Sequence, residues 1–124
     1  QLTESNDKQS LAVTAVQLAE TMGAKGIVVI TRRGLMADYV TNCHPQKTRI
    51  FAFTNDSQTR RRLILNRNLT PYRTAFSSDP EKTLQTSFDV LKERAGLQRN
   101  EKVVVISDVL AGTGIEAIQI RQLP

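Results

Sequence analysis

The chain is poor in several residue types, and each shortage excludes a class of protein. Its 124 residues include one cysteine, four prolines, six glycines and no tryptophan, and only 5% are aromatic. One cysteine cannot close an intramolecular disulfide, which argues against a disulfide-stabilised secreted scaffold and fits a reducing cytoplasm. No apolar run approaches the ~20 residues that span a bilayer, and residues 1–10, polar apart from Leu2, do not resemble a signal peptide. We therefore expect a cytoplasmic protein with no membrane partner.

Length and hydrophobic content predict one folded domain. A chain of 124 residues, 40% of them hydrophobic, can bury roughly two thirds of its unfolded surface and needs no disulfide or metal to fold. It contains no internal repeat, low-complexity tract or linker rich in proline and glycine. One histidine and one cysteine are too few ligands for a closed zinc site. We predict a single domain over residues 1–124, without a metal site.

Positive charge is concentrated in the middle of the chain. Residues 32–73 include nine Lys and Arg and two Asp, a net charge of +7, whereas the rest of the chain carries −2. This imbalance indicates an anionic partner, either a phosphorylated small molecule, a nucleic acid or an acidic protein surface, and the alternative is a solvated helix face. Nucleic acid is disfavoured because the run 60–62, three arginines, has no interleaved aromatic residues to stack on bases.

Two hydrophobic patterns alternate along the sequence. Helical spacing predicts helices over residues 7–22, 35–43 and 80–95, and a further helix, third in chain order, that runs through the arginines at 60–62 to Leu65. Ser5, Asn6 or Asp7 is expected to cap the first helix, and Asn55 or Asp56 the third. The run 78–81, Ser-Asp-Pro-Glu, places cap residues before a proline and marks the start of the fourth.

Continuous β-branched or aromatic runs predict buried strands at residues 26–31, 50–54 and 102–107. A short strand at 69–74 contains Pro71, which favours an edge or irregular position. Alternation around residues 118–120 predicts a half-exposed fifth strand.

The order of these elements predicts an α/β fold of three layers, in which helices cover both faces of a five-stranded, mostly parallel sheet. The last two strands have no helix between them, so the fifth should run antiparallel at an edge. Ligands of such folds lie beyond the carboxyl ends of the strands. The segments to examine are therefore 31–36, 54–57 and 107–114.

The turn after the first strand is the main candidate for a binding site. Gly34 allows a tight turn, and the following helix presents unpaired N–H groups beside Arg32 and Arg33, whose guanidiniums match phosphate oxygens. A second loop, Ala-Gly-Thr-Gly at 111–114, follows the fourth strand. We expect both loops on one side of the sheet, where they would form an anion site. The alternative for the second loop is a tight connection to the edge strand.

Two other arrangements do not predict catalysis. Cys43 and His44 are adjacent, and no acid stands at a local spacing that would orient the imidazole. Asp56 and Asp108 follow buried strands, as in phosphoacceptor receiver domains. A receiver also needs an acidic pair after its first strand, where this chain has arginines. No catalytic residue is predicted.

The sequence resembles the C-terminal domain of the pyruvate kinase family. Residues 23–34, Gly-Ala-Lys-Gly-Ile-Val-Val-Ile-Thr-Arg-Arg-Gly, are similar to the family's first strand and its Thr-x-Ser-Gly turn. Residues 53–61, Phe-Thr-Asn-Asp-Ser-Gln-Thr-Arg-Arg, and Pro71 further on are similar to its Gln-Thr-x-Arg and Gly-[Ile/Val]-x-Pro segments, with Asn68 in the place of the glycine. Arg33 and Met36 stand where the family has hydroxyl residues. The resemblance can be followed over residues 12–123.

This resemblance implies a regulatory and oligomerisation domain rather than a catalytic one. In the family, phosphoryl transfer occurs in a separate barrel domain, and the parent enzyme would use Mg and K with ADP and ATP. This domain would need no cofactor of its own and would contact other domains and subunits of a homo-oligomer. A sugar-phosphate or nucleotide effector would bind at the turn. The expected site residues are Thr31, Arg32, Arg33, Gly34, Leu35 and Met36, with Gly112, Thr113 and Gly114 from the second loop.

Two alternatives remain at this point. The chain would be a structural interaction module whose effector site has been lost, or, less favoured, a basic nucleic-acid-binding domain that uses the positive middle segment.

Overall fold

A computed structural model describes residues 2–107 and 117–124, with side chains from Asp7 onward within these ranges. There the chain forms helices and strands in the predicted order. The helices are α1 (Leu2–Met22), α2 (Leu35–Asn42), α3 (Ser57–Ile64) and α4 (Pro80–Arg94). The strands are β1 (Gly26–Ile30), β2 (Arg49–Thr54), β3 (Thr70–Arg73), β4 (Lys102–Ser107) and β5 (Ala117–Gln122).

The strands form one sheet in the order β3-β2-β1-β4-β5. β1 pairs in parallel with both β2 and β4, and β2 pairs in parallel with β3. β5 runs antiparallel to β4 at one edge, and β3, which contains Pro71, forms the other. The predicted α/β fold is therefore confirmed, as are both edge positions.

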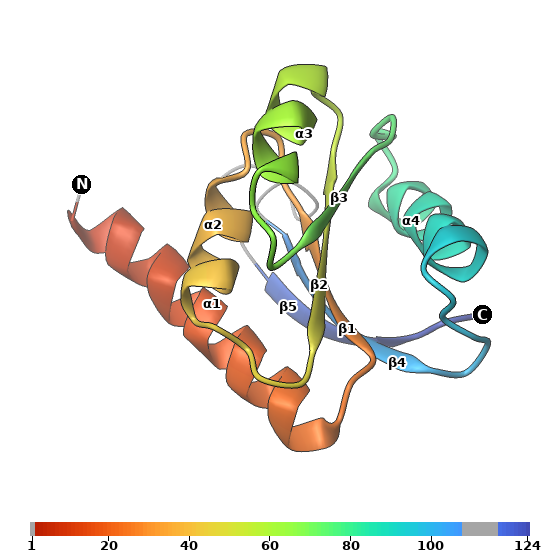
Figure 1. Cartoon of the computed structure of the whole chain (residues 1–124), viewed down its shortest axis with the longest axis horizontal. Coiled ribbons are helices and arrows are strands. Elements are labelled where there is room, and N and C mark those ends of the chain that lie inside the picture. Colours follow the sequence, from red (N-terminus) through yellow and green to blue (C-terminus); the bar gives the residue numbers. More distant parts are fainter. Residues whose placement is uncertain (1, 108–116) are drawn as a thin grey trace.

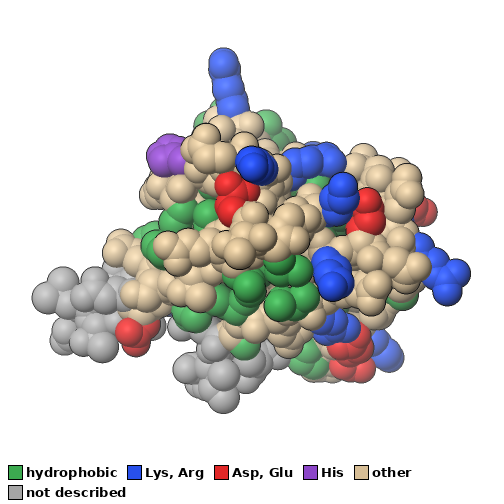
Figure 2. Space-filling view, turned by 90° about the horizontal axis from the view of Figure 1, so that it is seen from below, with side chains coloured by type: hydrophobic (Ala, Val, Ile, Leu, Met, Phe, Trp, Pro, Cys, Tyr) green, Lys and Arg blue, Asp and Glu red, His purple; other side chains and the backbone are tan. Residues whose placement is uncertain are grey.

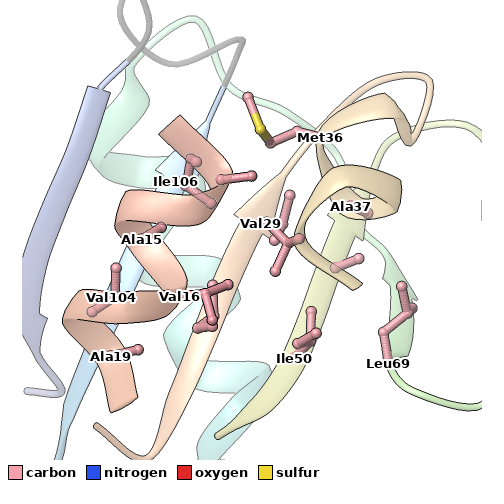
Figure 3. Packing of buried hydrophobic residues seen from close by; sticks show 14 of the residues in the cluster. Ala15, Val16, Ala19, Val29, Met36, Ala37, Ile50, Leu69, Val104 and Ile106 are labelled. Carbon is pink, nitrogen blue, oxygen red and sulfur yellow. The ribbon is translucent and has the colours of Figure 1, made fainter. Parts of the chain in front are cut away.

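Helices cover both faces of the sheet (Figure 1). On one face α1 and α2 pack side by side, and the small residues Ala12, Ala15 and Ala19 of α1 allow close approach to the strands. Figure 3 shows this packing around Val29 and Val104. On the opposite face α4 presents a buried stripe that includes Leu84, Phe88 and Leu91. No helix in the described ranges has the length and hydropathy needed to cross a bilayer.

The observed helix starts agree with those predicted from the sequence, except at α1. Asp56 caps α3 by accepting hydrogen bonds from the Thr59 N–H (3.0 Å) and hydroxyl (2.8 Å). Asp79 caps α4, with Pro80 as the first helical residue. The predicted cap at residues 5–7 is wrong, because α1 already begins at Leu2 and these residues lie within it. Apolar periodicity reports only the buried part of a helix, and the turn before it is entirely polar apart from Leu2.

Candidate functional site

The carboxyl ends of the parallel strands meet at one edge of the sheet. Ile30, the last residue of β1, lies in register with Phe53 of β2 on one side and Ser107 of β4 on the other. The turn at 31–36 and the segment that follows Ser107 therefore leave the sheet from adjacent strands. The predicted site residues Gly112, Thr113 and Gly114 lie outside the described residues.

Thr31 and Gly34 close the turn from inside. Thr31 is fully buried, and its hydroxyl oxygen accepts a hydrogen bond from the Gly34 N–H at 3.0 Å. Its own N–H donates to the carbonyl of Phe53. Gly34 has φ +88°, a left-handed conformation that glycine adopts without steric cost. The Thr31 side chain therefore shapes the turn instead of extending toward solvent.

Residues distant in the sequence satisfy the carbonyl groups of the turn. The Thr54 hydroxyl donates to the carbonyl of Arg32 at 2.9 Å. Arg62 of α3 donates to the carbonyl of Arg33 at 2.8 Å and pairs with Asp38 of α2 at 3.3 Å. One arginine of the 60–62 run therefore holds the candidate site together. Sequence reasoning missed this role because these partners are separated by more than 20 residues and share no local motif.

The two guanidiniums of the turn are exposed but differently placed. Arg32 lies over the ring of Phe76, with 5.6 Å from its guanidinium carbon to the ring centroid. Arg33 is exposed as well. Hydrogen bonds from Thr59, with a smaller contribution from the positive charge of Arg33, hold the pKa of Asp56 below its ordinary value. The edge therefore presents two exposed cations.

The start of α2 completes the candidate site. Gly34 occupies the N-cap position and provides no side-chain hydrogen bond to the first turn of the helix. Leu35 is 44% exposed, whereas Met36 is fully buried in the core shown in Figure 3. Met36 could therefore contact a ligand only through its backbone N–H. The first N–H groups of α2, with Arg32 and Arg33, form a positive surface suited to an oxyanion.

The opposite edge of the sheet, viewed in Figure 2, carries acidic side chains as well as basic ones. A cavity of about 450 Å³ lies at this edge. Glu20 accepts hydrogen bonds from the Gln46 and Lys47 N–H groups and from the Thr48 hydroxyl, and these bonds, the Thr48 one foremost, lower the pKa of Glu20. Lys25 lies 3.8 Å from a carboxylate oxygen of Glu101. Because two carboxylates, Glu20 and Glu101, line this cavity, we place no anion site here.

Cys43 and His44 follow α2 and form no catalytic pair with a third group in the described chain. The Cys43 thiol donates to the carbonyl of Tyr39 at 3.3 Å, and burial raises the pKa of the thiol. Among the described residues, no three His, Cys, Asp or Glu side chains are grouped as a metal site would require.

Comparisons with known proteins agree on one family. Residues 9–120 match the family model described as "Pyruvate kinase, alpha/beta domain". The chain is 33% identical over 116 residues to pyruvate kinase isozyme A, chloroplastic, of Ricinus communis, covering 94% of this chain and 19% of that protein. It is 35% identical over 98 residues to isozyme G, chloroplastic, of the same plant, covering 79% and 23% respectively.

A solved structure of Cryptosporidium parvum pyruvate kinase in complex with ADP superimposes with a TM-score of 0.84 at 21% identity, covering 94% of this chain and 24% of that one. This likeness shows the fold. The chain spans about a fifth of the length of the curated relatives described above.

Proposed function

Because the chain belongs to the pyruvate kinase α/β domain family, we propose that it is the regulatory and assembly domain of a pyruvate kinase. The relatives are about five times longer than the matched segment, so the remainder of such a protein has room for a separate catalytic domain. In this proposal the parent enzyme transfers the phosphoryl group there, with Mg, K and ADP or ATP. The present chain supplies no catalytic residue.

The proposed ligand is a phosphorylated effector, a sugar phosphate or a nucleotide, bound at the turn 31–36. The observation that carries this proposal is the way the turn is held. Thr54 and Arg62 bind its two carbonyl groups, so the negative ends of these peptide dipoles are engaged within the fold. The uncapped N-terminus of α2 and the two exposed guanidiniums remain available to bind an anion.

Isothermal titration calorimetry of the purified chain at low salt tests this proposal. We expect saturable heat with a sugar bisphosphate or a nucleotide. Arg32→Ala and Arg33→Ala should each weaken binding by about tenfold, because a hydrogen bond to a charged group contributes about 1.5–3 kcal/mol. Arg99→Ala removes another exposed arginine, outside the turn, and should bind like wild type. No heat at millimolar ligand would remove the effector from the proposal.

Assembly through β5 is the second part of the proposal. The outer edge of β5 has no partner strand in the described chain, and Ile120 on it is 53% exposed. An open edge with an exposed apolar side chain favours contact with a second subunit. We expect a homo-oligomer in sedimentation and a smaller species for Ile120→Lys. An oligomer that forms normally but binds no phosphate ligand would favour the alternative, a purely structural module.

The compartment is part of the same proposal. A lone thiol fits a reducing environment, and we propose the cytoplasm. The similar Ricinus proteins carry chloroplastic in their names, so cell fractionation that finds the native protein in plastids would overturn this assignment.

A further inference from the structure

Arg32 of the candidate effector turn lies against an aromatic ring from a different part of the chain. Its guanidinium carbon is 5.6 Å from the centroid of the Phe76 ring, within the range of a cation–π contact. Phe76 is half-buried and belongs to the segment that joins β3 to α4. Because β1, β2 and β3 run parallel, this segment and the turn leave the sheet at the same edge (Figure 1). Two residues distant in the sequence therefore meet at the candidate site.

The segment that carries Phe76 is anchored on both sides of the ring. Before it, the Thr74 N–H donates to the carbonyl of Thr54 at 2.9 Å. After it, the Ser77 N–H donates to the hydroxyl of Thr83 at 2.8 Å. Both acceptor residues are buried, one in β2 and the other in α4. The ring itself packs against the core beneath α4, so the fold fixes its position.

Thr54 also sets the position of the arginine relative to the ring. Its hydroxyl donates to the carbonyl of Arg32 at 2.9 Å, while its own carbonyl accepts the bond from Thr74. One buried residue of β2 therefore holds the backbone of Arg32 and the backbone that leads to Phe76. The contact between guanidinium and ring is thus determined by the packed fold, not by the arginine side chain alone.

A ring restrains a guanidinium without using its hydrogen-bond donors. Arginine has five N–H donors, and its attraction to a ring depends on the charge of the cation and on the electrons of the ring face. Within the described residues, the Arg32 side chain donates no hydrogen bond. Arg62 is held differently, because its N–H groups donate to the carbonyl of Arg33 and to Asp38. Arg32 is therefore held in place with its donors free for a ligand.

We infer that Phe76 is a positioning residue of the effector site, which holds the Arg32 guanidinium where it can bind a phosphate group of the ligand through two N–H donors. This inference rests on the proposed function. A flexible side chain must be ordered when it binds, and this ordering weakens affinity. Because the ring restrains Arg32 before the ligand arrives, Phe76 strengthens phosphate binding although it donates no side-chain hydrogen bond itself.

A measurement without ligand tests the contact. In ¹H–¹⁵N NMR spectra of the whole chain at pH 6, the Nε–Hε signal of Arg32 is assigned by its loss in Arg32→Ala. We expect the ring current of Phe76 to displace this signal from that of the exposed Arg99. Phe76→Leu keeps an apolar side chain against the core and should abolish the displacement. An undisplaced Arg32 signal in the wild-type chain would overturn the inference and leave the proposed effector site intact.

Isothermal titration calorimetry tests what the contact does, with fructose 1,6-bisphosphate and ATP as separate probes of the whole chain at low salt. Phe76→Leu should weaken binding of the probe that the wild-type chain binds by about fivefold. Phe76→Tyr keeps a ring and should bind like wild type. Tyr72→Leu is the matched control, because it removes a half-buried ring that packs against the same core, and it should leave binding unchanged.

A double-mutant cycle separates positioning from packing. In an Arg32→Ala background Phe76→Leu should cause no further loss of affinity, because the ring acts through that arginine. An undiminished loss in this background, or an equal loss in Phe76→Tyr, would overturn the inference. Binding by the wild-type chain that Phe76→Leu does not weaken would overturn it as well, yet preserve the proposed function. Binding of neither probe by the wild-type chain would remove the proposed effector and this inference together.

Discussion

Gly34→Ala tests the contact that holds the candidate effector turn together. Gly34 has φ +88°, and a Cβ added there would lie 2.3 Å from Nη2 of Arg62. That atom belongs to the flexible end of a side chain, so it can move away. In doing so, Arg62 must release the carbonyl of Arg33 and its contact with Asp38. The substitution therefore combines backbone strain with the loss of one bridging arginine.

The two contributions can be estimated separately. A left-handed alanine costs about 1–2 kcal/mol relative to its preferred conformation, and part of this is offset because alanine restricts the unfolded chain more than glycine does. The hydrogen bond of Arg62 contributes about 1 kcal/mol, the low end for charged donors, because half of its side chain is exposed. We expect Gly34→Ala to lower the free energy of unfolding by about 2–3 kcal/mol.

Gly23→Ala is the matched control. Gly23 also has a positive φ, +66°, but an added Cβ would meet nothing within 4 Å. It should show the strain alone, about 1 kcal/mol. Urea unfolding followed by far-UV circular dichroism measures both variants, because the chain has no tryptophan to report by fluorescence. In an Arg62→Ala background most of the difference between the two glycine substitutions should disappear, because only the 3.3 Å approach of the added Cβ to Thr59 Cγ2 is left at position 34. A difference that persists there undiminished, or no difference in the wild-type background, would refute the role given to Arg62.

Three further outcomes follow from the packing and the titrating groups. The pKa of Glu20 is lowered mainly by its hydrogen bond from Thr48. The ionised Glu20 therefore stabilises the fold above the ordinary glutamate pKa, and this stabilisation is lost as the pH falls through the lowered pKa. The difference in the free energy of unfolding between wild type and Glu20→Gln should close on acidification, as measured by urea unfolding from pH 7 to pH 2. Phe88→Ala removes a fully buried ring from the inner face of α4 and should lower the free energy of unfolding by about 3–5 kcal/mol. Leu65 is 83% exposed, so Leu65→Ala should change it by no more than about 0.5 kcal/mol in the same assay. Because burial raises the pKa of the Cys43 thiol, iodoacetamide at neutral pH should modify the folded chain more slowly than the urea-unfolded chain, and equal rates would contradict its burial.

Most of the fold could be predicted because its signals are local. β1 is a run of β-branched residues after a glycine, and all five of its positions are buried. Asp79 before Pro80 marks the start of α4, as predicted. The start of α1 could not be read in this way, because its first turns carry little apolar periodicity.

The candidate site was predictable only in part. The position of Arg32 and Arg33 at a strand end follows from the element order, and the structure places both on the exposed edge. The burial of Thr31 and Met36 does not follow from it, because which side of a turn faces the core depends on the helices packed above it.

The amino-acid sequence alone settled the succession of helices and strands, the antiparallel last strand and the excess of positive charge in the middle of the chain. These depend on periodicity, connection length and composition, which act between near neighbours. Only the tertiary structure decided which arginines are engaged and which are free. Arg62 bridges to a carbonyl 29 positions away, whereas Arg60, two residues earlier on the same helix, faces an open cavity. The physical reason is helix geometry, which turns residues two positions apart to different sides, combined with what the packed sheet places on each side.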